Sequence, residues 1–212
     1  TLDQLRLELA PFIAQAAAFD GWSAQAVSTA ANALGVDPDV AAYACKGGQM
    51  EMIADWIAHV DARTEAELSA IALGAMKIRE RISALVLFRL DAISGMEEST
   101  RRALAIMAMP QNAARAIKLG WHSADLMWRL AGDTATDYNH YTKRAILASV
   151  YAATLAIFID DETEGKTDTR AFLDRRIDGI MRFEKTKAQL LRSPEERFSL
   201  SRFLGRLRYP AK

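Results

Sequence analysis

Two aspartates four residues apart, Asp133 and Asp137, come nearest in type and spacing to a pair that could do acid–base chemistry. Two carboxylates can share such work only when their surroundings hold their pKa values apart. Both flank the corner that runs from Gly132 to Asp137, where backbone amide groups at a helix start stabilise the ionised form. No second group in the sequence is placed to raise the pKa of either one. We therefore expect no catalytic residue and no enzymatic activity.

Metal binding is the second chemistry to consider. His59, His122 and His140 lie in separate segments, and Cys45 is the only cysteine. A di-iron site in a helical bundle needs two Glu-x-x-His motifs and two further glutamates. The sequence also lacks a phosphate-binding glycine loop and a Cys-x-x-Cys motif. We predict no metal site and no bound cofactor, and a single cysteine favours a reducing compartment.

Composition limits the partners and the fold class. Half of the 212 residues are hydrophobic, and 27 basic residues balance 27 acidic ones. A chain without net charge has no global field that attracts nucleic acid. Its strong helix formers, interrupted by only five prolines, predict a nearly all-helical fold. No run has the length of a membrane span, and no segment has the order of a signal peptide.

Apolar residues recur at three- and four-residue spacings along most of the chain, which predicts amphipathic helices. A capping box at Thr64 and Glu67 predicts that a new helix begins there. Gly120 is expected to separate two helical pieces, and the acidic connection 160–165 is expected to be a solvated turn. The predicted helices cover residues 2–19, 24–34, 37–45 (starting at 37 or 38), 50–60, 64–94, 97–109, 111–119, 123–131, 139–161 and 168–191.

The first three of these helices have the spacing of the helix-turn-helix of TetR-type regulators. A recognition helix needs lysine, arginine or hydrogen-bonding side chains that reach phosphates and base edges. Between Asp20 and Gly47 the only cation is Lys46, against three aspartates. We therefore predict a degenerate helix-turn-helix over residues 1–48 that does not bind nucleic acid.

One string at the polar corner carries a family resemblance. It reads W-x-x-A-G-D-x-x-T-D-x-N-x-Y-T-x-R and consists of Trp128, Ala131, Gly132, Asp133, Thr136, Asp137, Asn139, Tyr141, Thr142 and Arg144. This string resembles the signature of the Coq-nine family, lipid-binding accessory factors of ubiquinone biosynthesis. The resemblance extends over most of the chain and is strongest from Trp128 to Tyr151. It implies an all-α, TetR-like helical bundle that forms a homodimer and leaves the chemistry to a partner enzyme.

The body of the chain, residues 49–192, offers apolar side chains for a lipid slot between helices. The same residues could equally close on one another as an ordinary core, because a core and a cavity need the same side chains. The resemblance implies that the slot holds an isoprenoid quinone precursor or other lipid. The residues expected to line it are Leu85, Phe88, Met107, Ile117, Leu126, Ile146, Val150 and Leu155.

The corner is the expected contact surface for the partner. Aromatic residues and arginine carry most interface energy, and the resemblance implies that the partner is the di-iron demethoxyubiquinone hydroxylase. The alternative is that Trp128 and Tyr141 fill the core beneath the corner. The expected contact residues are Met127, Trp128, Asp137, Asn139, Tyr141 and Arg144.

The last segment, residues 193–212, predicts an amphipathic helix. A helix this short is marginal in water and needs a surface on which to fold. Docking on an anionic membrane is favoured over packing on the body or on a partner helix. The apolar face comprises Leu200, Phe203, Leu204 and Leu207, and the basic residues toward the other face are Arg202 and Arg206.

Two readings of function remain at this point. The resemblance implies a peripheral protein on the cytoplasmic face of a bacterial inner membrane, or on the matrix side of the mitochondrial inner membrane if the source is eukaryotic. Alanine and arginine usage favours a bacterial source. The alternative is a TetR-type transcription regulator that responds to a ligand.

Overall fold

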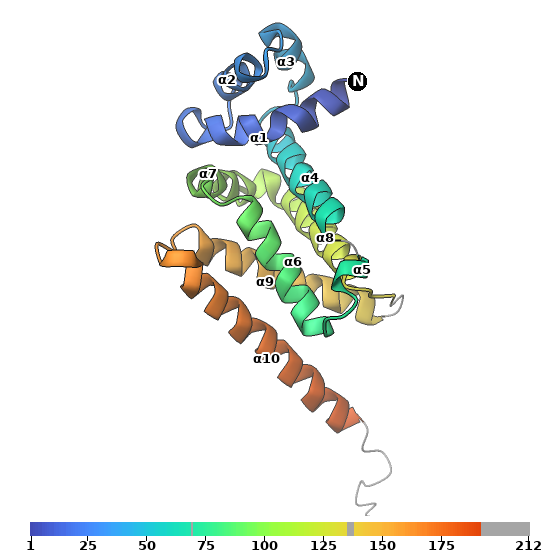
Figure 1. Ribbon diagram of the computed structural model, residues 1–212. Coiled ribbons are helices and arrows are strands. Elements are labelled where there is room, and N and C mark those ends of the chain that lie inside the picture. Colours follow the sequence, from blue (N-terminus) through green and yellow to red (C-terminus); the bar gives the residue numbers. More distant parts are fainter. Residues whose placement is uncertain (69, 135–137, 192–212) are drawn as a thin grey trace, which may run out of the picture. The chain divides into compact units, whose positions relative to one another are not determined.

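The computed structural model describes residues 1–68, 70–134 and 138–191 (Figure 1). Every regular element within these ranges is a helix, which confirms the expected all-α fold. The chain divides into two compact units, Thr1–Asp174 and Arg175–Lys212. The domain boundaries expected at residues 48 and 192 stay predictions. The first unit holds α1 to α9 and the beginning of α10.

The three N-terminal helices begin and end at local capping residues. The Thr1 hydroxyl accepts from the backbone of Gln4, and the Ser23 hydroxyl accepts from the backbone of Ala26. Gly35 ends the second helix in the left-handed conformation, at φ 67°. Asp37 Oδ1 accepts from the backbone nitrogen of Asp39 at 2.8 Å and starts the third. These three predicted helices are confirmed as α1 (Leu2–Asp20), α2 (Ala24–Leu34) and α3 (Pro38–Ala44).

The helix start predicted at Thr64 is wrong. Helix α4 (Gln49–Glu67) runs through this position without a break. Thr64 is buried, and its hydroxyl donates to the Val60 carbonyl at 2.7 Å. A threonine hydroxyl inside a helix often bonds the carbonyl four residues earlier, so the capping-box pattern arose by chance here.

A short helix and a turn separate α4 from the next long helix. Helix α5 (Ala70–Leu73) precedes α6 (Ile78–Ala92). The start of α6 is set by Glu80, whose Oε2 accepts from the Lys77 backbone nitrogen at 3.0 Å. A glutamate at the third helical position thus satisfies an amide that the helix itself leaves unpaired.

The break predicted at Gly120 is also wrong. After α7 (Glu97–Met107) and the 3-10 turn η1 (Pro110–Asn112), helix α8 (Ala113–Leu130) is continuous through Gly120. A single glycine in a helix costs only about 1 kcal/mol relative to alanine. The packing of α8 against neighbouring helices outweighs that cost.

The corner after α8 ends the helix as the sequence predicted. Gly132 has φ 90°. The backbone nitrogen of Asp133 donates to the Trp128 carbonyl at 2.9 Å, and that of Gly132 donates to the Arg129 carbonyl at 3.0 Å. These two bonds form a Schellman motif, in which glycine takes the left-handed position. Helix α9 (Tyr138–Phe158) follows.

The acidic connection after α9 is not simply a solvated turn. Asp161 is buried, and its carboxylate accepts from both the backbone nitrogen and the hydroxyl of Thr169, at 2.8 Å and 2.6 Å. It also accepts from the Thr163 backbone nitrogen at 2.9 Å. The connection includes η2 (Glu164–Lys166) and leads into α10 (Thr167–Leu191). Asp161 therefore satisfies one amide in the first turn of α10, that of Thr169, and one in the connection before it, that of Thr163.

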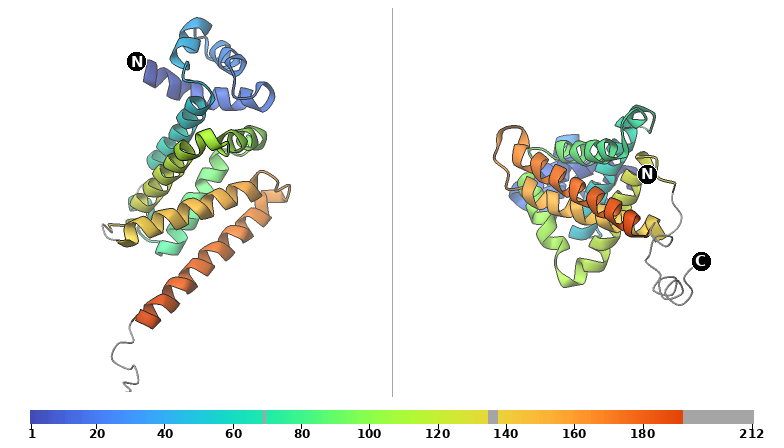
Figure 2. Two further views of the ribbon diagram at one scale, coloured as in Figure 1. Left: turned by 180° about the vertical axis from the view of Figure 1, so that it is seen from behind. Right: turned by 90° about the horizontal axis from the view of Figure 1, so that it is seen from below.

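Helices α4 and α8 form the centre of the first unit. Helix α4 packs against α1, α6, α7 and α8, whereas α8 packs against α4, α6, α7 and α9. Helices α1 to α3 form a cluster at one end of α4, and α9 crosses the far side of α8 (Figures 1 and 2). Five helices, α4 and α6 to α9, thus surround a common interior.

Candidate functional site

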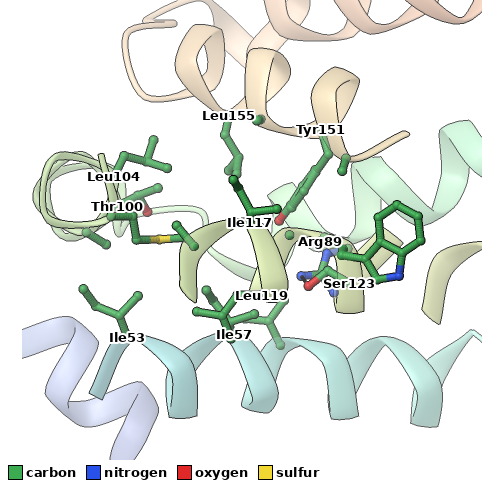
Figure 3. Close-up of a pocket in the computed structure, with 18 of the residues that line it drawn as sticks. Ile53, Ile57, Arg89, Thr100, Leu104, Ile117, Leu119, Ser123, Tyr151 and Leu155 are labelled. Carbon is green, nitrogen blue, oxygen red and sulfur yellow. Dashed lines mark hydrogen bonds between the residues drawn. The ribbon is translucent and has the colours of Figure 1, made fainter. Parts of the chain in front are cut away.

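A cavity of about 610 Å³ lies between α4, α6, α7, α8 and α9 (Figure 3). Its walls are almost entirely apolar. Volumes of several hundred Å³ with few polar groups are typical of small-molecule sites. Among its larger apolar lining residues are Ile53, Ile57, Val60, Leu104, Met107 and Leu155.

Small residues on α8 and α9 leave room for the cavity. Ala116 and Gly120 line it from α8, and Ala148 and Ala152 line it from α9. A Cβ atom built on Gly120 would meet no neighbouring atom within 4 Å, so this position borders open space. The larger side chains of the lining stand around these four positions without filling the space between them.

The lining contains one charged group among the described residues, the guanidinium of Arg89. Arg89 Nη1 bonds to Asp61 Oδ1, and Nη2 donates to Ser123 Oγ at 3.1 Å. Ser123 Oγ in turn donates to Asp61 Oδ1 at 3.0 Å. All three side chains are buried. They form one closed polar cluster at the cavity wall.

Tyr151 completes this cluster on the cavity side. The Arg89 guanidinium carbon lies 5.0 Å from the centre of the Tyr151 ring. Burial lowers the pKa of Arg89, but Tyr151 and Asp61 outweigh burial and raise it above the ordinary arginine value. The guanidinium therefore stays charged inside an apolar wall. Sequence analysis did not single out this cluster, although one arginine inside the apolar stretch 85–90 was a usable signal.

The residues expected to line a lipid slot divide into three groups. Those in the cavity wall are Met107, Ile117 and Leu155. Those buried in the surrounding core and outside the wall are Leu85, Leu126 and Val150. Those half-buried and outside the wall are Phe88 and Ile146. Ile117 is 72% exposed, so it lies where the cavity opens to solvent.

The polar corner is held by ion pairs between α8 and α9. Arg144, buried on α9, bonds to Asp125 through Nε and to Asp133 through Nη1, the latter at 3.1 Å. Lys143 Nζ lies 2.6 Å from the other oxygen of Asp133. Burial would raise the pKa of Asp133, but bonds from Lys143 and Arg144 outweigh it and lower this pKa. Asp133 is therefore held ionised, which does not suit a proton donor.

The expected partner-contact residues differ widely in exposure. Met127 and Arg144 are buried, so they shape the corner from within. Trp128 is half-buried, and its indole nitrogen donates to the Lys143 carbonyl at 2.9 Å. Tyr141 is 62% exposed. Asp137 and the side chain of Asn139 lie outside the described residues.

Tyr141 belongs to an aromatic group that sequence analysis did not identify. Its ring centre lies 6.0 Å from that of Trp121 and 5.1 Å from that of His140. Trp121 also lines the cavity. This group therefore connects the outer surface near the corner with the cavity wall. A helical projection of the two segments, with Trp121 and Tyr141 on the sides that face each other, could have predicted this group.

The residues expected to dock on a membrane lie outside the described residues. They are Leu200, Arg202, Phe203, Leu204, Arg206 and Leu207. In the part of the chain that the structure describes, no helix combines the length and apolar character needed to cross a membrane. That same part holds no group of three histidine, cysteine or acidic side chains suited to a metal ion.

Comparison with known proteins identifies relatives that match most of the chain. A family model described as COQ9 matches residues 113–184. The chain is 33% identical over 177 residues to ubiquinone biosynthesis protein COQ9, mitochondrial, from Rattus norvegicus, covering 80% of this chain and 56% of that protein. The chain is a COQ9 homologue. The protein of the same name from Homo sapiens is 32% identical over 177 residues, with 80% and 55% covered.

The chain spans just over half the length of the curated COQ9 proteins that it matches. A solved structure shares its fold: the TetR transcriptional regulator from Nitrosomonas europaea ATCC 19718 is similar with a TM-score of 0.66 and 21% identity. The match covers 82% of this chain and 97% of that one. The TetR-like fold expected of a COQ9 homologue is thereby confirmed.

Helix α3 (Pro38–Ala44) is the helix that the sequence comparison with TetR-type regulators would make a recognition helix, an assignment that stays a prediction. Its exposed side chains include Asp39, Val40 and Tyr43. Lys46 follows the helix, and its Nζ lies 4.5 Å from the centre of the Tyr43 ring. An acidic and apolar helix face does not suit contacts with DNA phosphates.

Proposed function

We propose that this COQ9 homologue is a non-catalytic accessory protein of ubiquinone biosynthesis. It binds an isoprenoid quinone precursor or a related lipid in the cavity and presents it to the di-iron hydroxylase that acts on demethoxyubiquinone. One observation carries the proposal. A chain related to proteins named for ubiquinone biosynthesis contains an apolar cavity of about 610 Å³.

Hydrophobic transfer would supply the binding energy. An isoprenoid chain consists of carbon and hydrogen alone, and its burial gains about 2.5 kcal/mol for every ~100 Å² of apolar surface removed from water. The small residues of α8 and α9 leave the space that such a chain needs, and the isoleucine and leucine side chains of α4, α7 and α9 supply apolar contacts. Affinity in this mechanism scales with the length of chain inside the cavity.

Presentation would occur at the polar corner. Tyr141 is exposed and close to Trp121, which lines the cavity, so a partner bound there lies near one wall of the ligand site. The ion pairs of Arg144 hold α8 and α9 together beneath this surface. In this proposal the corner recognises the hydroxylase, and the hydroxylase carries out the chemistry.

A membrane surface would supply the lipid. Residues 193–212 combine an apolar face with arginines and would dock on anionic lipid. The protein would act as a homodimer on the cytoplasmic face of a bacterial inner membrane, or on the matrix side of the mitochondrial inner membrane. The relatives from rat and human are named as mitochondrial proteins.

Mass spectrometry of lipid extracted from the purified chain tests the proposal. We expect an isoprenoid quinone or its precursor at close to one per chain. Replacing Ala148 and Ala152 together by leucine fills the cavity from α9 and should remove most of the bound lipid. Ala156→Leu is the matched control, because Ala156 is exposed on the same helix and does not line the cavity. Equal lipid in both variants, or none in the wild-type chain, would contradict the proposal.

A further inference from the structure

The guanidinium of Arg81 ties together two parts of the chain that lie far apart in the sequence. Its Nη1 donates to the Ala131 carbonyl at 2.9 Å. Its Nη2 donates to the Gly74 carbonyl at 2.9 Å, and its Nε donates to the Met76 carbonyl at 2.8 Å. Ala131 directly follows the last residue of α8, where carbonyl groups have no partner within the helix. Arg81 of α6 therefore caps the end of α8 and fixes it to the turn between α5 and α6.

The same guanidinium lies against the polar corner. A Cβ atom built on Gly132 would lie 3.1 Å from Arg81 Nη1. Asp133, the next residue, is bonded to Lys143 and Arg144 of α9. The corner and the turn before α6 are thus held in one fixed geometry, with α5 beside the end of α8 (Figures 1 and 2).

The segment 74–79 exposes apolar and basic side chains in alternation. It reads Gly-Ala-Met-Lys-Ile-Arg, and all six residues are exposed. Met76 and Ile78 are each 40% exposed. Lys77 lies between them, and the sequence contains no acidic residue from position 68 to position 79. The 74–79 segment therefore presents a basic, apolar surface next to the polar corner.

A protein face suits this surface better than a lipid bilayer does. At 40% exposure Met76 and Ile78 lie along the surface of the chain, whereas insertion into a bilayer buries a whole apolar face. Protein interfaces are shape-complementary and enriched in methionine and aromatic residues, and the corner adds Tyr141, which is 62% exposed. Such an interface needs its parts at a fixed separation, which Arg81 provides. The positive charge of Lys77 selects acidic side chains on the partner.

We propose that the 74–79 segment and the polar corner form one docking surface for a partner protein with an acidic, apolar face. Arg81 is the positioning residue that holds the two parts of this surface together. The proposal rests on the proposed function, because its partner is the hydroxylase expected at the corner. It adds a second contact region to that interaction and states the chemistry of the partner face that meets it.

Charged substitutions at Ile78 test the docking surface on the full 212-residue chain. Biolayer interferometry measures the dissociation constant for the purified di-iron hydroxylase of the same organism. Ile78→Glu should weaken binding by about tenfold or more, because it places a negative charge against an acidic face. Ile78→Lys should weaken binding less. Ile78 is the first residue of α6, where an acidic side chain favours the helix, so unfolding would not explain a loss caused by Ile78→Glu.

Val40→Glu is the matched control for Ile78→Glu. Val40 is also β-branched, is 45% exposed and lies in the first turn of α3. Helix α3 lies at the opposite end of α4 from the corner (Figure 1). This control should bind the hydroxylase like the wild type. Tyr141→Ala probes the corner itself and should weaken binding.

Arg81→Lys tests the positioning role. Lysine keeps the positive charge but lacks the planar guanidinium that reaches three carbonyls together. The variant should bind the hydroxylase more weakly. Ile78→Glu should then cost less in the Arg81→Lys background than in the wild type, because the 74–79 segment is no longer held beside the corner. A contribution of Arg81 to stability alone would leave the cost of Ile78→Glu unchanged, so additive costs would overturn the positioning role.

The remaining outcomes separate this proposal from the proposed function. If Ile78→Glu binds like the wild type while Tyr141→Ala does not, the docking surface ends at the corner and the proposed function stands. An equal loss for Val40→Glu, or a greater loss for Ile78→Lys than for Ile78→Glu, would likewise overturn the proposal. If the wild-type chain does not bind the hydroxylase, the proposal and the presentation step of the proposed function fail together.

Two further measurements exclude other occupants of the 74–79 segment. Co-sedimentation with vesicles of phosphatidylcholine and phosphatidylglycerol should be the same for the wild type and Ile78→Glu. The mass of the chain in solution should also be unchanged. A lower vesicle-bound fraction would assign the segment to lipid, and a lower mass would assign it to a second copy of the chain; either result would overturn the proposal.

Discussion

The single replacement Arg89→Met should destabilise the protein far more than the double replacement that also changes Asp61 to leucine. In the wild type the two side chains are 2% and 8% exposed. Removing Arg89 alone leaves the Asp61 carboxylate in the interior, where the Ser123 hydroxyl still donates to it but no longer with a counter-charge beside it. A buried charge without its counter-charge is the most costly result of a substitution at such a pair.

The magnitude follows from this burial. Breaking a buried ion pair by removing one partner costs about 3–5 kcal/mol, and for a chain of this size that lowers the melting temperature by about 6–20 °C. Replacing both partners by apolar residues of similar size is often neutral or stabilising. We therefore expect the double variant to be closer to the wild type than to the single variant.

Urea unfolding followed by circular dichroism at pH 7 measures these differences. Glu67→Gln serves as the control, because it breaks an exposed pair on α4, in which Arg63 Nη2 lies 3.3 Å from Glu67 Oε1. Exposed pairs contribute little to stability, so this control should unfold like the wild type. A loss below about 1 kcal/mol for Arg89→Met, or a double variant as unstable as the single one, would refute the reasoning.

Two further predictions concern the helix boundaries. Asp161→Ala should cost about 2 kcal/mol of stability at pH 7, because it removes the acceptor for the buried Thr169 amide. In the wild type, burial raises the pKa of Asp161, but the hydrogen bonds that its carboxylate accepts outweigh burial and lower this pKa. Because the pKa of Asp161 is lower in the folded chain, its ionised carboxylate stabilises the fold at pH values above the unfolded pKa of about 3.9, and this contribution is lost progressively as the pH falls below that value. The variant should therefore lose less stability than the wild type between pH 5 and pH 3 in urea titrations. Parallel curves for the two proteins would argue against this role of Asp161. Gly132→Ala should cost about 1–3 kcal/mol of stability in thermal unfolding, because φ is 90° at this position. Gly120→Ala lies inside α8 and faces open space, so it should be neutral or stabilising. Equal effects of the two variants would contradict the assignment of Gly132 as a left-handed helix end.

Several features of the fold are set by contacts within a few residues, and the sequence was sufficient to predict them. Ser23 and Asp37 begin helices by accepting from amides two or three residues ahead. Gly35 and Gly132 end helices because only glycine adopts positive φ at little cost. The failures have the opposite character. Thr64 and Gly120 carry local signals for a break, but packing of α4 and α8 against several helices keeps both helices continuous.

The candidate site was only partly predictable for the same reason. Periodicity identified an apolar body and placed Met107, Ile117 and Leu155 among its apolar residues, but it could not separate a wall from a filled core. Whether space remains depends on how closely five helices approach, and the alanines and the glycine of α8 and α9 decide this only once the helices are placed.

Residue types and short spacings thus determined an all-helical chain, the ends of several helices and the family to which the corner string points. Only the tertiary structure decided that Arg89 bonds to Asp61, 28 residues away in the sequence, and that Arg144 bonds to Asp125, 19 residues away. It also decided that an apolar cavity lies beside the first of these pairs, with Arg89 as the one charged lining residue in the part of the chain that is described. The physical reason is the separation in sequence between the groups that interact. A cap is satisfied within one helical turn, whereas a buried charge must find its partner on another helix after both have packed.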